Sequence, residues 1–138
     1  MILHIRAIEA CNVPKKDIIG LSDPYLKFET STSTQKWKTK YIRNTKTPEW
    51  NEEFHIPITS LLNDILYVSL WDKDDISKDD FISSIDFNIR DEFPLGKVLD
   101  KWYQMRPGEG TKEGGKVRLI IQLNKSGYEP FSEEEILT

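Results

Sequence analysis

The chain has 138 residues, of which 38% are hydrophobic and 30% are charged, a balance typical of one globular domain with its own core. Its longest apolar runs reach about four residues, whereas a transmembrane helix needs about 20, so we expect no membrane-spanning helix. The net charge of −4 argues against a nucleic-acid partner, and the single cysteine, Cys11, excludes an internal disulfide and favours a reducing, cytoplasmic setting.

Short segments of alternating or apolar residues follow one another between turn signals, which predicts eight β-strands. In chain order we expect them at 3–10, 24–30, 36–42, 50–58, 65–71, 81–89, 101–105 and 116–123. The segment 65–71 contains few polar residues, which predicts a strand covered on both faces. Short helical turns are expected only at 60–64 and 90–92. The pattern predicts an all-β fold, either an antiparallel sandwich or a barrel.

We divide the chain into one domain, residues 1–124, and an acidic C-terminal tail, residues 125–138. The tail carries one Lys and four Glu, and its polar composition predicts a loosely attached extension.

Aspartates gather in two of the connections between the expected strands. The first–second connection contains Asp17 and Asp23, and the fifth–sixth connection contains Asp72, Asp74, Asp75, Asp79 and Asp80. Alternate connections of an antiparallel sandwich lie at the same end, so the two acidic connections are expected to meet there with the third–fourth. Asp is also a common turn residue, which explains one Asp in one loop but not this concentration in two. The clustered oxygens favour calcium, since a softer metal prefers Cys or grouped His.

Three stretches of the sequence resemble the C2 domain family of calcium- and phospholipid-binding modules. They read LHIRAIEACNVPKKDIIGLSDPYLKF, NTKTPEWNEEF and LYVSLWDKDDISKDDFI, in the family's order and spacing, and the likeness covers residues 2–123. The resemblance implies an eight-stranded antiparallel Greek-key β-sandwich that holds two or three calcium ions at one end. The chain opens on the strand before the first acidic loop, an order that resembles the family's type II topology and its single-module members.

The resemblance also implies a set of site residues in the two acidic loops. The carboxylate ligands match Asp17, Asp23, Asp72, Asp74 and Asp80, the side chain of Ser77 is a minor ligand, and Lys16 and Lys73 offer backbone carbonyls. Asp75 and Asp79 match no ligand position. Three apolar residues in the same loops, Ile18, Ile19 and Ile76, are predicted to enter a membrane interface.

A basic segment without any acid runs from residue 36 to residue 46. Its alternation predicts that Lys36, Lys38 and Lys40 project from one face, with Arg43 close by. One interpretation is a solvated outer face; the other, favoured by the resemblance, is a site for anionic lipid headgroups such as phosphoinositides.

These features predict a monomeric module that binds anionic phospholipid membranes in the presence of calcium, recruited from the cytoplasm to the inner face of a membrane. Two alternatives are a calcium-regulated module that binds proteins without direct lipid contact, and an interaction domain indifferent to calcium. Catalysis is not expected, because His4 and His55 stand alone, without Ser, Cys or paired acids at a catalytic spacing.

Overall fold

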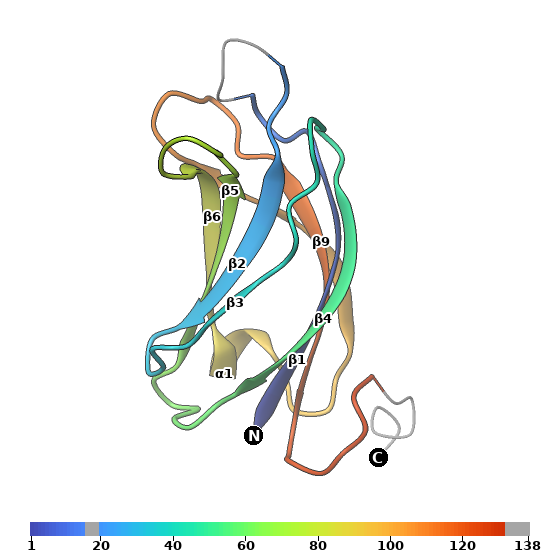
Figure 1. Ribbon diagram of the computed structural model, residues 1–138. Helices are drawn as coiled ribbons and strands as arrows, with labels where there is room; N and C mark the ends of the chain where they lie inside the picture. Colours follow the sequence, from blue (N-terminus) through green and yellow to red (C-terminus); the bar gives the residue numbers. More distant parts are fainter. Residues whose placement is uncertain (16–19, 132–138) are drawn as a thin grey trace.

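A computed structural model describes residues 1–15 and 20–131 of the chain, and it consists of two antiparallel β-sheets packed face to face (Figure 1). The four-stranded sheet contains, in spatial order, β4 (Glu49–Pro57), β1 (Ile2–Cys11), β9 (Lys116–Asn124) and β7 (Leu99–Gln104). The five-stranded sheet contains, in spatial order, β3 (Lys36–Lys38), β2 (Pro24–Thr30), β5 (Ile65–Asp72), β6 (Asp80–Asn88) and β8 (Arg106–Pro107). The predicted all-β antiparallel sandwich is confirmed.

The described residues form nine strands, one more than expected. The additional strand, β8, has only two residues and pairs with Ser83 and Ser84 of β6. Two residues cannot show an alternating pattern, so periodicity alone gives no signal for such a strand. The expected turn at 90–92 lies within the short helix α1 (Ile89–Glu92), which is capped where Asn88 accepts a hydrogen bond from the Asp91 amide.

Strand β3 ends at Lys38, four residues earlier than predicted, because a side chain replaces the next step of the ladder. The Thr39 amide donates to the carbonyl of Leu26 at 2.9 Å, while the hydroxyl oxygen of Thr39 accepts from the Leu26 amide, also at 2.9 Å. Farther along, the Ile42 amide donates to the carbonyl of Pro24 at 3.1 Å. The segment therefore follows β2 beyond the end of β3 without forming a regular strand.

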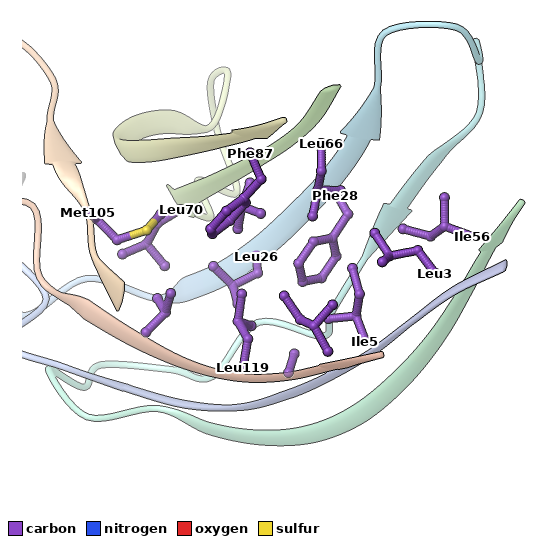
Figure 2. Close-up of a cluster of buried hydrophobic side chains, with 14 of the residues drawn as sticks. Leu3, Ile5, Leu26, Phe28, Ile56, Leu66, Leu70, Phe87, Met105 and Leu119 are labelled. Carbon is purple, nitrogen blue, oxygen red and sulfur yellow. The ribbon is translucent and has the colours of Figure 1, made fainter. Parts of the chain in front are cut away.

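The hydrophobic core fills the space between the two sheets, where side chains from both converge (Figure 2). The four-stranded sheet supplies Leu3, Ile5, Ala7, Ile56, Val117, Leu119, Ile121 and Leu123. The five-stranded sheet supplies Leu26, Phe28, Leu66, Val68, Leu70, Ile82 and Phe87. Alternate residues of each strand point inward, as the two-residue period of a strand requires. Burial of one such side chain stabilises the fold by roughly 1.5–3 kcal/mol, so the core fixes the register of the strands.

The prediction that strand β5 is covered on both faces is wrong. Leu66, Val68 and Leu70 are fully buried, but Tyr67, which points the other way, is 39% exposed. The outward-pointing side chains of β5 are half-buried or exposed. The low number of polar residues in 65–71 therefore does not mean that both faces of the strand are buried.

Within the part of the chain that the structure describes, no helix is long and apolar enough to cross a membrane.

Candidate metal site

Three connections meet at the end of the sandwich opposite α1 (Figure 1). They link β1 to β2, β3 to β4 and β5 to β6. The carboxylate of Asp72 accepts a hydrogen bond from the Asp23 amide at 2.8 Å, and the carboxylate of Asp23 accepts from the Asn44 amide at 2.7 Å. These bonds join one residue from each connection, so the three connections form a single surface, which we call the loop pole.

Three of the predicted carboxylate ligands gather at the loop pole. Asp72 ends β5 and is 2% exposed, and it lies directly opposite Asp80, the first residue of β6. Opposed residues of an antiparallel pair project to the same face of the sheet. Asp23 lies immediately before β2, and its amide donates to the Asp72 carboxylate. The carbonyl of Asp23 accepts a hydrogen bond from the Lys73 amide at 3.0 Å. The structure therefore brings together Asp23, Asp72 and Asp80, with Lys73 beside them.

The carboxylate of Asp74, another predicted ligand, turns toward its own loop. One oxygen accepts from the amides of Ile76 at 2.9 Å and Ser77 at 3.2 Å, and the other accepts from the Ser77 hydroxyl at 2.9 Å. The hydrogen bonds from these amides and from the hydroxyl lower the pKa of Asp74 below its ordinary value. Asp74 and the predicted minor ligand Ser77 are thus in contact, and the carboxylate is ionised at neutral pH.

Asp79, which matched no ligand position, is a central member of the loop pole. Its carboxylate accepts from the Tyr25 hydroxyl at 2.5 Å and the Asp74 amide at 3.0 Å, and it lies 3.6 Å from the ammonium of Lys73. Burial alone would raise its pKa, but these hydrogen bonds and the Lys73 charge hold the pKa below the ordinary value. The sequence pattern gives no signal for this role, because it depends on a contact with Tyr25, 54 positions away.

The described part of the loop pole supplies an incomplete set of metal ligands. Lys16, Asp17, Ile18 and Ile19 lie outside the described residues. Within residues 1–15 and 20–131, no group of three or more His, Cys, Asp or Glu side chains is placed so that it could hold a metal ion.

The donor chemistry at the loop pole nevertheless fits calcium. Asp23, Asp72 and Asp80 offer carboxylate oxygens, and they come from two loops that a hydrogen bond holds against each other. Calcium binds such oxygens with flexible geometry, so residues of this kind could hold it here.

The predicted row of amines begins on the edge strand β3, where Lys36 lies opposite Glu29, and continues toward the loop pole through Lys38 and Lys40. Lys36, Lys38 and Lys40 are exposed, while Trp37, Thr39 and Tyr41 between them are half-buried or buried. The Lys40 amide donates to the carboxylate of Glu52 on β4 at 2.7 Å.

A pocket of about 420 Å³ opens between this row and the β5–β6 connection. It is lined by Tyr25, Lys38, Thr39, Lys40, Tyr41, Lys73 and Asp79. The row of amines and the acidic loop therefore share one concave surface.

Lys27 is a further amine that the sequence did not single out. It lies opposite Lys38 across the β2–β3 pair, and its ammonium is 4.1 Å from the ring centroid of Trp71. Burial lowers the pKa of Lys27, and the charges of Lys36 and Lys38 lower it further against the opposing effect of Glu29. Its position became recognisable only with the pairing of β2 and β3.

Arg43 and Asp75 pair with each other across two connections. The guanidinium of Arg43 lies 3.7 Å from the carboxylate of Asp75, and both side chains are well exposed. Arg43 also donates to the hydroxyl of Tyr41 at 3.2 Å. The structure thus directs Arg43 toward the acidic loop and gives Asp75 a partner that the sequence did not indicate.

Comparison with known proteins gives a consistent result. The profile of the C2 domain family matches residues 1–105. Human cytosolic phospholipase A2 delta is 34% identical over 112 residues, which are 80% of this chain and 13% of the phospholipase. This chain therefore corresponds to a small part of that relative.

Solved structures support the same fold. The first C2 domain of a plant extended synaptotagmin 1 has a TM-score of 0.79 at 24% identity, with 96% of both chains covered, a likeness that concerns the fold alone. A calcium-bound structure of the paired C2 domains of extended synaptotagmin 2 has a TM-score of 0.71 at 26% identity, covering 88% of this chain and 44% of that one. With the profile match over most of its length, the chain belongs to the C2 domain family.

Proposed function

We propose that this chain binds calcium at the loop pole and, in the calcium-loaded state, docks on anionic phospholipid membranes. The observation that supports the proposal is that Asp23, Asp72 and Asp80 occupy neighbouring backbone positions on two joined loops, next to exposed basic and apolar side chains. Calcium, when bound, supplies positive charge and coordination positions that lipid phosphate oxygens can fill.

The residues of the loop pole have separate tasks in this proposal. Asp23, Asp72 and Asp80, together with Asp17, hold two or three ions, and Asp74 and Ser77 contribute further oxygens from the same loop. Without a cation, these carboxylates repel an anionic surface, and neutralising them removes that barrier. The chain then moves from the cytoplasm to the inner face of a membrane.

Ile76 is positioned to enter the bilayer interface. Its side chain is 98% exposed at the tip of the β5–β6 connection, and the Asp74 carboxylate holds its amide at 2.9 Å. An apolar side chain at this position gains free energy when it leaves water. Ile18 and Ile19 have the same role in the proposal.

Replacing Ile76 with Ser is expected to weaken vesicle binding about tenfold, which corresponds to about 1.4 kcal/mol for an apolar side chain buried in part. Calcium affinity in solution should remain within about twofold, because the change removes no oxygen ligand. Vesicle co-sedimentation and calorimetry measure the two quantities. Leu62→Ser is the matched control: Leu62 is 63% exposed in the β4–β5 connection, away from the loop pole, and its loss should change neither quantity.

The row of amines has a second task in the proposal. Lys36, Lys38 and Lys40 contact anionic headgroups, including phosphoinositides, while the loop pole holds calcium. Arg43, in the β3–β4 connection, assists once Asp75 no longer neutralises it.

The proposal is tested by sedimentation with vesicles of phosphatidylserine and phosphatidylcholine. We expect the protein in the pellet with calcium, and in the supernatant with a chelator or with phosphatidylcholine alone. Calcium binding by calorimetry without any vesicle binding would support a calcium-regulated protein-binding module instead. Absence of calcium binding, with or without vesicles, would contradict both functions.

A further inference from the structure

The chain turns back after β9 (Figure 1), and Phe131 packs against the outer face of the four-stranded sheet. Its amide donates to the side-chain oxygen of Gln122 at 2.5 Å. The guanidinium of Arg6 lies 4.2 Å from the centroid of its ring, and the ring of His4 meets it edge-on at 6.0 Å between centroids. Gln122 is fully buried and also donates to the carbonyl of Gly96 at 2.9 Å, so Phe131 is attached to a rigid point.

The backbone of Phe131 has a φ of 60°, in the left-handed region. This conformation is unfavourable for a residue with a side chain. The contacts with Arg6, His4 and Gln122 must offset that cost, so weakening one of them favours release of the segment.

The surface beneath Phe131 contains a pair of imidazoles. The Nδ1 atoms of His4 and His55 are 2.7 Å apart, so one ring donates a hydrogen bond and the other accepts it. His4 is 4% exposed, whereas His55 is exposed and lies 3.4 Å from the carboxylate of Glu53. The expectation that the two histidines stand alone is wrong, because β1 and β4 pair them directly.

The charged groups around this pair come from two strands. Arg6 on β1 lies 2.7 Å from the carboxylate of Glu53 on β4, and His55 shares that carboxylate. On the other side of His4, β9 presents the uncharged Gln122. One carboxylate therefore already balances Arg6 before any imidazole is protonated.

Protonation of the pair has two different steps. With one added proton the pair keeps its hydrogen bond, because one of the two Nδ1 atoms can still accept. A second proton leaves no acceptor nitrogen between the two Nδ1 atoms and places two cations beside Arg6 with a single carboxylate. Burial lowers the pKa of His4, and the neighbouring His55 lowers it further, so His4 is neutral at neutral pH.

We propose that the segment ending at Phe131 is a strap held on the outer face of the four-stranded sheet by the neutral His4–His55 pair, and released when both imidazoles are protonated. A charged His4 is stabilised by reaching water, and Phe131 packs against it from the outer side. Release exposes this face of the sheet. The strap involves neither calcium nor lipid, so this proposal can be tested independently of the proposed function.

The test follows the Phe131 amide by NMR hydrogen exchange in a chelator-containing buffer between pH 8 and pH 5, above the ordinary range of Glu titration. After correction for the intrinsic rate, we expect protection of this amide to fall about tenfold or more on acidification, while core amides of β1 and β9 keep theirs. Phe131→Ala should leave residues 127–131 mobile at both pH values, as heteronuclear relaxation reports.

Two variants separate the imidazole pair from a general effect of acid. His4→Gln and His55→Gln each remove one titrating ring, and Gln can still accept or donate at the same place. Both variants should keep Phe131 ordered at pH 5. His55→Gln alters an exposed side chain and leaves the buried position intact, so it remains informative if His4→Gln does not fold. An ordered Phe131 at pH 5 in the parent, or release of the strap in both variants as in the parent, would overturn the proposal.

Discussion

Replacing Asp72 with Asn is expected to weaken calcium binding at least about tenfold, because affinity at oxygen sites depends strongly on the number of charged ligands. Asn has nearly the same shape, and its carbonyl oxygen can still accept the hydrogen bond that Asp72 accepts from the Asp23 amide. The fold should therefore persist. Calorimetric titration with calcium measures the effect directly.

Thermal unfolding gives a second readout for the same variant. An ion that binds only the folded chain stabilises it by about 2.7 kcal/mol at 100 times its dissociation constant, and this gain should disappear in Asp72→Asn. In chelator, the variant should be at least as stable as the parent, because one repelling charge is gone. Asp86→Asn is the control: it removes the same charge from the same strand pair, where Asp86 faces Arg106 instead of the loop pole. Equal calcium affinity in parent and Asp72→Asn would remove Asp72 from the site.

Changing Lys36, Lys38 and Lys40 together to Gln is expected to cost up to about 3 kcal/mol of binding to acidic vesicles, since each basic residue near an anionic surface contributes about 1 kcal/mol. This corresponds to a loss of up to about 150-fold in affinity. Calcium binding in solution should hardly change, because the amines lie along the edge of the five-stranded sheet and provide no oxygen. Co-sedimentation with phosphoinositide-containing vesicles at low salt measures the loss.

Salt and a matched variant distinguish a specific row from general positive charge. Raising the ionic strength should reduce the difference between variant and parent, since screening acts within roughly 8–10 Å at physiological salt. The control changes three exposed lysines associated with the other sheet, Lys97, Lys101 and Lys116, to Gln. If both triple variants lose affinity equally, net charge explains the effect; if neither loses affinity, the row is a solvated face.

The fold was predictable from the sequence because core residues recur at every second position of a strand. The alternation that predicted β1 and β9 also places Leu3, Ile5 and Leu119 on one face of each strand, and all three lie in the core. Alternation gave the wrong end for β3, because the hydroxyl of Thr39 forms a hydrogen bond in place of the ladder. Alternation also missed β8, because two residues are too few to show a period.

The sequence indicated which loops carry the candidate ligands, but it did not indicate how their side chains are oriented. Spacing within two loops indicated Asp23, Asp72 and Asp80, because strand ends fix where such residues lie. Spacing could not show that Asp79 accepts from Tyr25, since that contact depends on pairing across the sheet between residues 54 positions apart. The contact between His4 and His55 was missed for the same reason.

The edge strands of the five-stranded sheet affect whether molecules crowded on a membrane associate with one another. Recruitment to a bilayer concentrates a protein in two dimensions, where unpaired backbone groups at a sheet edge invite edge-to-edge association. One edge here is β3, three residues long and flanked by lysines, and the other is β8, two residues long and ending in Pro107, which has no amide hydrogen to donate. Neither edge of this sheet offers another chain a long ladder, so we expect little association through the five-stranded sheet when molecules gather on one surface.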